Sequence, residues 1–297
     1  MFMLLFAACQ PPKTDTADLV DLVDGIDPST PFNKIQVFGT HNSYHIAPES
    51  TTIDEWNYTH DPLDIQLDKG IRQLEIDVVW DPERMLIAVQ HVPVIDARST
   101  CDLLRDCLRV ITLWLDENPN TVPLQILIEP KTEIPAWSMS DRMDELDEVL
   151  REGLSGRLWT VADQWGGYES IHQSILEGGF PTIGALRGRA LVTLLDNGAP
   201  KDAYTRGDTD IRDRVMFPLM PAEHEWAGYF LRDDPYSEEI AQLHALGFLV
   251  RTRADAGLIY DEARWMTAYN GQANAISMDT QAGLEHLDSQ NPVRVLE

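Results

Sequence analysis

The chain has 297 residues, of which 43% are hydrophobic and 24% are charged, a composition typical of a globular protein with a substantial core. Its 23 Lys and Arg residues against 49 Asp and Glu residues give a formal net charge of −26. This charge repels phosphate backbones and anionic membrane surfaces at long range, so nucleic-acid binding is not expected. An anionic small substrate remains compatible with it, because a bound cation can reverse the field inside one pocket.

The N-terminus carries an apolar segment, residues 1–9, that ends in two small residues and Cys9. It resembles the end of a bacterial lipoprotein signal, so we expect lipidation at Cys9 and an exported protein in the cell envelope, in the periplasm or on the outer membrane. Such a signal normally begins with a longer basic and apolar stretch, which indicates a start codon upstream. The alternative is an apolar N-terminus of a cytosolic protein.

The next segment, residues 10–31, is acidic and weakly patterned and predicts a disordered tether. Residues 32–297 then form one folded domain, which we expect to be monomeric. Within that domain Cys101 and Cys107 are an even pair six residues apart. A disulfide is expected in an oxidising compartment, provided that Cys101 precedes the following helix, because i and i+6 on one helix lie about 9 Å apart. Two buried free thiols are the alternative.

Short β-type runs alternate with helical patterns along this domain. Eight candidate strands are the number that a TIM-type (β/α)8 barrel needs, whether regular or distorted. An open doubly wound sheet is the alternative, but no Gly-rich phosphate loop follows any strand. The expected strands are 35–39, 72–78, 85–90, 124–128, 190–195, 215–217, 248–252 and 275–278, and the expected helices are 61–69, 101–117, 140–153, 168–177, 237–246 and 261–270.

Polar side chains gather where the first four expected strands end. A period of two puts Glu75 and Asp77 on one face of the second strand. If the strands share one barrel, their C-terminal ends meet at one mouth, and the residues gathered there are His41, Asn42, Glu75, Asp77, His91 and Glu129. Carboxylate and amide oxygens without a thiolate favour Ca²⁺ over Zn²⁺. Each residue alone would more often be a solvated or ion-paired side chain, and only the conjunction indicates a site.

These motifs, together with those near the end of the chain, resemble the phosphatidylinositol-specific phospholipase C superfamily, and most closely its bacterial Ca²⁺-dependent branch. The segments that carry the resemblance are 39–45, 66–77, His91, 128–131, 193–196, 247–255 and 273–279. The related glycerophosphodiesterases would show His-Arg-Gly where this chain has His41-Asn42-Ser43. One departure is the last strand, which reads Ser277-Met278-Asp279 where the branch more often ends in Ser-Thr-Asp.

The resemblance implies a phosphodiesterase that cleaves a phosphoinositide or related lipid with the substrate's own 2-hydroxyl and forms a cyclic phosphate. It implies Ca²⁺ on Asn42, Glu75, Asp77 and Glu129, with His91 as general acid and His41 stabilising the phosphoryl group. The base would be Glu129, Glu75 or a histidine.

Three cations near these motifs are candidate contacts to the phosphate or headgroup, namely Lys131, Arg251 and Arg253. For the two arginines the alternative is ion pairing with Asp255 and its neighbours inside the barrel. Two other functions stay open. A glycerophosphodiesterase would use water as the nucleophile, and an envelope-anchored binding barrel would keep the fold and the metal without turnover.

Overall fold

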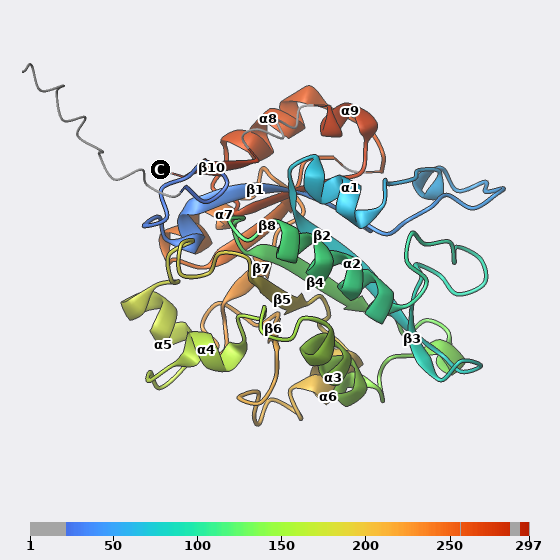
Figure 1. The fold of residues 1–297 in the computed structure, drawn as a ribbon, viewed down its shortest axis with the longest axis horizontal. Helices are drawn as coiled ribbons and strands as arrows, with labels where there is room; N and C mark the ends of the chain where they lie inside the picture. The colour runs from blue at the N-terminus through green and yellow to red at the C-terminus, as the bar shows by residue number, and fades with distance from the viewer. Residues whose placement is uncertain (1–21, 256, 286–291, 297) are drawn as a thin grey trace, which may run out of the picture.

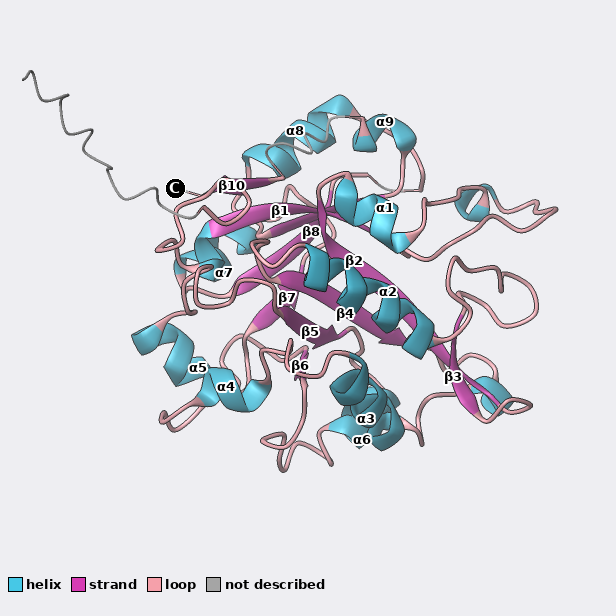
Figure 2. Cartoon of the chain, viewed as in Figure 1, coloured by secondary structure: helices cyan, strands magenta, loops and turns pink. Residues whose placement is uncertain are grey.

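The computed structural model describes residues 22–255, 257–285 and 292–296. Its sheet curls into a nearly closed barrel of parallel strands in the order β6-β5-β4-β2-β1-β9-β8-β7, with helices around the outside (Figures 1 and 2). The predicted TIM-type architecture is therefore confirmed. The strands are β1 Ile35–Thr40, β2 Ile71–Asp81, β3 Leu86–Val89, β4 Leu124–Pro130, β5 Ala190–Leu194, β6 Met216–Pro218, β7 Tyr229–Leu231, β8 Leu249–Arg253, β9 Ala275–Met278 and β10 Val293–Val295.

The identity of one barrel strand differs from the prediction. The run at 85–90 is a strand, β3, but it pairs antiparallel with the end of β2 and lies outside the barrel. Figure 1 shows it at the lower right, beyond the barrel mouth. The eighth barrel strand is the short β7, which the sequence analysis missed. The prediction of β3 as a barrel strand was wrong because an apolar run does not encode the direction of its partner.

Each of the six predicted helical ranges contains a helix, whereas three short helices, α4, α6 and α9, lie outside those ranges. The α-helices are α1 Leu63–Asp68, α2 Leu104–Glu117, α3 Met143–Gly153, α4 Val161–Trp165, α5 Ile171–Gln173, α6 Ala199–Tyr204, α7 Glu239–Ala245, α8 Glu262–Asn270 and α9 Gln281–Leu284, with a π-turn at Ser174–Gly178 and short 3₁₀ turns at Phe32–Lys34, Asp54–Trp56 and Pro135–Trp137. Helix α2 shows why such segments are helical, since its buried residues recur every three or four positions and face the sheet. No helix within the described residues is both long and apolar enough to cross a bilayer.

The predicted tether is too long at its C-terminal end, because residues 22–31 pack on the barrel. Val23 is fully buried. Asp24 accepts hydrogen bonds from the Arg72 guanidinium at 2.9 and 3.0 Å, from Thr121 Oγ1 at 2.7 Å and from the Val122 N–H at 2.9 Å. These partners lie at or before the starts of β2 and β4, so this ion-pair cluster fastens the chain to the N-terminal face of the barrel. Residues 10–21, and Cys9 with its predicted lipidation, lie outside the described residues.

Cys101 and Cys107 form a disulfide, with their Cα atoms 5.3 Å apart. Helix α2 begins at Leu104, so Cys101 precedes it as the pairing requires. The bridge closes the start of α2 onto the segment that follows the β3 hairpin.

The barrel has one seam. Among the described strands, β6 and β7 stand at the two ends of the hydrogen-bonded order and share no ladder. Every other neighbouring pair of barrel strands is joined by a parallel ladder.

Candidate active site

A cleft of about 300 Å³ opens at the C-terminal ends of the barrel strands. Its lining combines acids, cations and a few apolar side chains, namely His41, Glu75, Glu129, Leu195, Asp196, Asn197, Leu219, Leu231, Asp233, Arg251 and Arg253. Most of the predicted site residues therefore meet at one mouth, as expected.

Three carboxylates converge there because of strand register. Glu75 and Asp77 are two residues apart on β2 and point to the same face, and Asp77 lies directly opposite Glu129 on β4. Each of the three places an oxygen within 4.8 Å of the others. Glu75 and Asp77 are buried, whereas the Glu129 side chain is 30% exposed. This arrangement concentrates negative charge at one point of the mouth.

Asn42 is tied beside these carboxylates by the loop that follows β1. The Ser43 N–H donates to the Glu75 carbonyl oxygen and the Glu75 N–H donates to Ser43 Oγ, both at 2.8 Å. Asn42 itself has a φ of 44°, a left-handed conformation that Asn tolerates better than most residues. Its side chain is buried, and its Oδ1 has no hydrogen-bond partner within the described residues.

The three predicted substrate-binding cations are all paired with carboxylates. Lys131 Nζ lies 2.9 Å from Asp77 Oδ2 and 2.6 Å from Glu129 Oε1. These two carboxylates raise the pKa of Lys131 above its ordinary value despite the opposing effect of burial. Both arginines form ion pairs inside the barrel mouth, although Asp255 is not their main partner. Arg251 is buried and pairs with Glu75 and Asp233, and Arg253 pairs with Asp279. The role of these cations toward substrate stays a prediction.

His41 stands between the cleft and a buried acid that the sequence analysis did not single out. Its Nδ1 lies 2.9 Å from Asp279 Oδ2, and its Nε2 lies 3.5 Å from Glu75 Oε1. Arg253 Nη2, at 2.8 Å, and His60 Nε2, at 3.3 Å, also contact Asp279. Burial disfavours the His41 imidazolium, but the charges of Asp279 and Glu75 outweigh it and raise the pKa of His41. Although burial opposes it, the two histidines and Arg253 lower the pKa of Asp279.

Glu129 responds differently from Asp279. Burial and the neighbouring charge of Asp77 raise its pKa to about 7, although Lys131 acts in the opposite direction. A carboxyl group with such a pKa at the mouth of a cleft is typical of an acid–base or metal-binding position.

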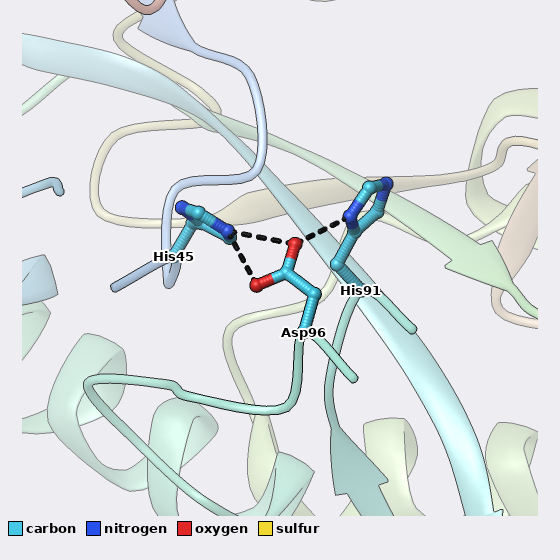
Figure 3. A group of neighbouring side chains, drawn as sticks. All are labelled: His45, His91 and Asp96. Atoms are coloured by element: carbon cyan, nitrogen blue, oxygen red, sulfur yellow. Dashed lines mark hydrogen bonds and ion pairs between the residues drawn. The ribbon is translucent and has the colours of Figure 1, made fainter. Parts of the chain in front are cut away.

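His91 belongs to a second cluster and is not among the residues that line the cleft. It follows the β3 hairpin, and its Nδ1 lies 2.8 Å from Asp96 Oδ2, while His45 Nε2 lies 3.0 Å from both Asp96 oxygens (Figure 3). The Tyr58 ring stacks on His45 at 4.3 Å and meets His60 edge-on at 5.2 Å. Tyr58 and His60 therefore connect the cluster of His45, Asp96 and His91 to the pair of His41 and Asp279.

Sequence reasoning missed the acids that hold the histidines. Asp279 directly follows β9, so the same strand-end rule that selected Glu129 could have found it. Asp96 and the role of His45 had no such signal, because they are 51 residues apart in the chain and meet only in the fold.

The donor set fits Ca²⁺. Asn42 Oδ1 and Asp77 Oδ1 are buried oxygens without a hydrogen-bond partner in the described part of the chain, and Glu75 and Glu129 supply further oxygens. Such hard oxygen ligands, with several carboxylates, are those that Ca²⁺ prefers. The residues that would hold the ion are thus Asn42, Glu75, Asp77 and Glu129.

A family model described as "Phosphoinositide phospholipase C, Ca2+-dependent" matches residues 30–88 and 84–294. The chain belongs to this family. This phospholipase C family member is accordingly an enzyme of the phosphodiesterase class, and Ca²⁺ is its cofactor. A search of curated proteins finds no match to its sequence.

Solved structures share the fold of this family member. A Ca²⁺-dependent phosphatidylinositol-specific phospholipase C from Streptomyces antibioticus has a TM-score of 0.69 and 18% identity, over 90% of this chain and 99% of that chain. A calcium-dependent phosphoinositol-specific phospholipase C from Pseudomonas sp, described as a myo-inositol complex, has a TM-score of 0.68 and 16% identity, over 93% and 99%. The phosphatidylinositol-specific enzyme from Listeria monocytogenes has a TM-score of 0.55 and 14% identity, over 92% and 96%.

Proposed function

We propose that this enzyme cleaves a phosphoinositide or a related headgroup lipid by attack of the substrate's own 2-hydroxyl, which gives a cyclic phosphate. The observation that carries the proposal is the cleft in which Glu75, Asp77 and Glu129 converge beside His41. The myo-inositol complex of the Pseudomonas enzyme supports the headgroup class.

When bound to these oxygens, Ca²⁺ supplies Lewis-acid neutralisation of charge on the phosphoryl oxygens. His41 donates a hydrogen bond from Nε2 to the phosphoryl group, because Asp279 holds its Nδ1 and, with Glu75, raises the pKa of the ring although burial acts against it. Arg253, partly exposed in the cleft and fixed by Asp279, adds a second positive contact.

Glu129 takes the proton of the attacking hydroxyl. Of the three carboxylates it is the most exposed, so it is the one that a substrate hydroxyl can reach. Glu75 is unsuited to this role, because it is buried and engaged with Arg251. His91 protonates the leaving oxygen.

The test is a panel of phosphodiesters with the purified enzyme, assayed with Ca²⁺ and with a chelator and followed by ³¹P NMR. Cleavage of phosphatidylinositol to a cyclic inositol phosphate is the expected result. An open phosphate from glycerophosphodiesters would identify the glycerophosphodiesterase alternative, and Ca²⁺ binding without turnover of any diester would identify the binding barrel.

We also propose export and lipidation at Cys9, on the apolar residues that precede it. Mass spectrometry of the native gene product should find a diacylglyceryl group on Cys9. A cytosolic product with residues 1–9 intact would contradict it.

A further inference from the structure

A continuous hydrogen-bonded group is formed by His45, Asp96 and His91 (Figure 3). The His45 N–H donates to the Asn42 carbonyl oxygen, which ties the group to the loop that carries Asn42. His45 and Asp96 are fully buried, whereas His91 is 23% exposed. Figure 3 shows the second ring nitrogen of His91, Nε2, on the side of the ring away from Asp96. Asp96 thus holds Nδ1 of His91, and Nε2 remains available for proton transfer.

The partners of His45 hold its ring at both nitrogens. Its Nδ1 is 2.9 Å from the Tyr58 carbonyl oxygen, and its Nε2 is 3.0 Å from both oxygens of Asp96. Both partners offer acceptor oxygens, so His45 can donate a hydrogen bond that holds Asp96 in place. The hydrogen bonds from His45 and His91 outweigh burial and lower the pKa of Asp96.

A strained turn brings Asp96 to this position. Val92 and Asp96 exchange two backbone hydrogen bonds, at 2.9 and 3.0 Å, around the three residues between them. Val94, in the middle, has a φ of 71°, which a β-branched residue rarely adopts. Strain of this kind persists where the surrounding structure requires one geometry, and here the turn sets Asp96 directly beneath His91.

We propose that Asp96 and His45 are positioning residues for His91: Asp96 keeps a proton on His91 Nδ1, and His45 holds Asp96 in place. This inference rests on the proposed role of His91 as the general acid. When the phosphorus–oxygen bond breaks, the leaving oxygen keeps the electron pair and takes the proton from His91 Nε2. His91 then becomes neutral with its Nδ1–H still on Asp96, and neither Asp96 nor His45 changes its protonation.

The charge beside His91 is that of Asp96. Among the described residues, the groups placed against His91 are Asp96, the His45 ring at 6.2 Å and the uncharged Trp56 ring at 5.6 Å. The Asp96 carboxylate stabilises protonated His91. Removing that carboxylate charge should therefore move the alkaline limb of the kcat profile to lower pH.

The kinetic test uses phosphatidylinositol in detergent micelles, whose leaving group is an alkoxide, and 4-nitrophenyl myo-inositol 1-phosphate, whose leaving group departs unprotonated. Asp96→Asn should lower kcat on the lipid by ~10²-fold with little change in KM, and should largely spare the nitrophenyl ester. Its alkaline limb should move to lower pH, whereas His45→Gln, which keeps the Asp96 charge, should lower kcat on the lipid by less. Adding Asp96→Asn to His91→Ala should cost nothing further.

Asp81→Asn is the matched control, since Asp81 is a buried carboxylate at the end of β2 that accepts bonds from the Glu83 and Arg84 N–H groups and, within the described residues, from no imidazole. It should match the wild type on both substrates. Equal losses on the two substrates for Asp96→Asn, or an alkaline limb that stays in place, would overturn the proposal.

A second measurement does not depend on activity. Long-range ¹H–¹⁵N spectra of the wild-type chain should show a proton on His91 Nδ1 both while the ring is charged and after Nε2 has lost its proton. A neutral His91 that carries its proton on Nε2 would overturn the proposal even if the enzyme is active, whereas the expected spectra with no turnover of any diester would remove the proposed function alone. The three residues also offer a ligand set for a transition metal. Stoichiometric Zn²⁺ binding that Asp96→Asn abolishes would replace the hydrogen-bonded arrangement with a metal site.

Discussion

The two faces of the barrel hold their buried charges in opposite ways. On the N-terminal face, one carboxylate, Asp24, receives the guanidinium of Arg72, a hydroxyl and a backbone N–H, so its acceptors are matched by donors. On the C-terminal face, Glu75, Asp77 and Glu129 converge, and Asn42 Oδ1 and Asp77 Oδ1 have no hydrogen-bond partner within the described residues. Both clusters are ionic and largely buried, so burial and charge alone do not separate them.

The balance of donors and acceptors is what separates them. A satisfied cluster stabilises the fold, because removing any partner leaves a buried charge unpaired. A cluster with surplus oxygens has capacity for a cation, and here burial together with the neighbouring charge of Asp77 raises the pKa of Glu129. The comparison predicts that changes on one face alter activity and changes on the other alter stability.

The largest expected effect is the loss of the cation from the mouth. A chelator should lower turnover of phosphatidylinositol by roughly 10³-fold, because Lewis-acid stabilisation of this kind is worth several kcal/mol. Calorimetric titration should find one Ca²⁺ per chain, and Asp77→Asn should weaken that binding. Full turnover after exhaustive dialysis against chelator would show that the C-terminal face does not need a cation for activity.

Asp24→Asn should produce the complementary result. Breaking the buried pair leaves Arg72 uncompensated, which should cost about 3 kcal/mol in the free energy of unfolding while kcat stays unchanged. Urea unfolding monitored by tryptophan fluorescence measures the first quantity. The exposed carboxylate of Asp64 on α1 provides the control, since Asp64→Asn should change neither. A drop in kcat for Asp24→Asn without loss of stability would contradict the division of roles.

On the C-terminal face, variants of His41 and His91 should differ in the leaving groups whose cleavage they slow. His91→Ala should lower cleavage of alkyl phosphodiesters by ~10²-fold and retain much of the nitrophenyl ester rate, whereas His41→Ala should lower both. Steady-state kinetics on the two substrate types decide between them. Wild-type rates in both variants would make the histidines structural.

The smallest expected effect is an acid dependence of stability. Although burial acts in the opposite direction, the hydrogen bonds and charge of Arg72 lower the pKa of Asp24 below its ordinary value of 3.8. A lowered pKa contributes stability that is complete above that ordinary value and is lost as the pH falls through the folded-state value. The difference in unfolding free energy between wild type and Asp24→Asn should therefore shrink below about pH 4. A difference that grows on acidification would show that the ion pair is not its source.

The parts of the site that sequence could predict are those set by local pattern. The period of two on β2 places Glu75 and Asp77 together, and the strand-end rule brings Glu129 to them. The parts it could not predict depend on pairing. The direction of β3, the three-residue β7 and the meeting of His45 with Asp96 are each decided by partners distant in the chain. The cations Lys131 and Arg251 illustrate the same limit, because sequence showed their charge but not the carboxylates they face.

The seam between β6 and β7 gives the cleft one compliant wall. Leu219 follows β6 and Leu231 ends β7, and both line the cleft. Since no ladder joins these described strands, widening the mouth there breaks no sheet hydrogen bond, whereas widening it between β1 and β2 would. Substitutions at these two leucines can thus reshape the cleft without disturbing the strands that align the carboxylates. The seam is therefore the part of the barrel where substrate range can diverge at the lowest structural cost.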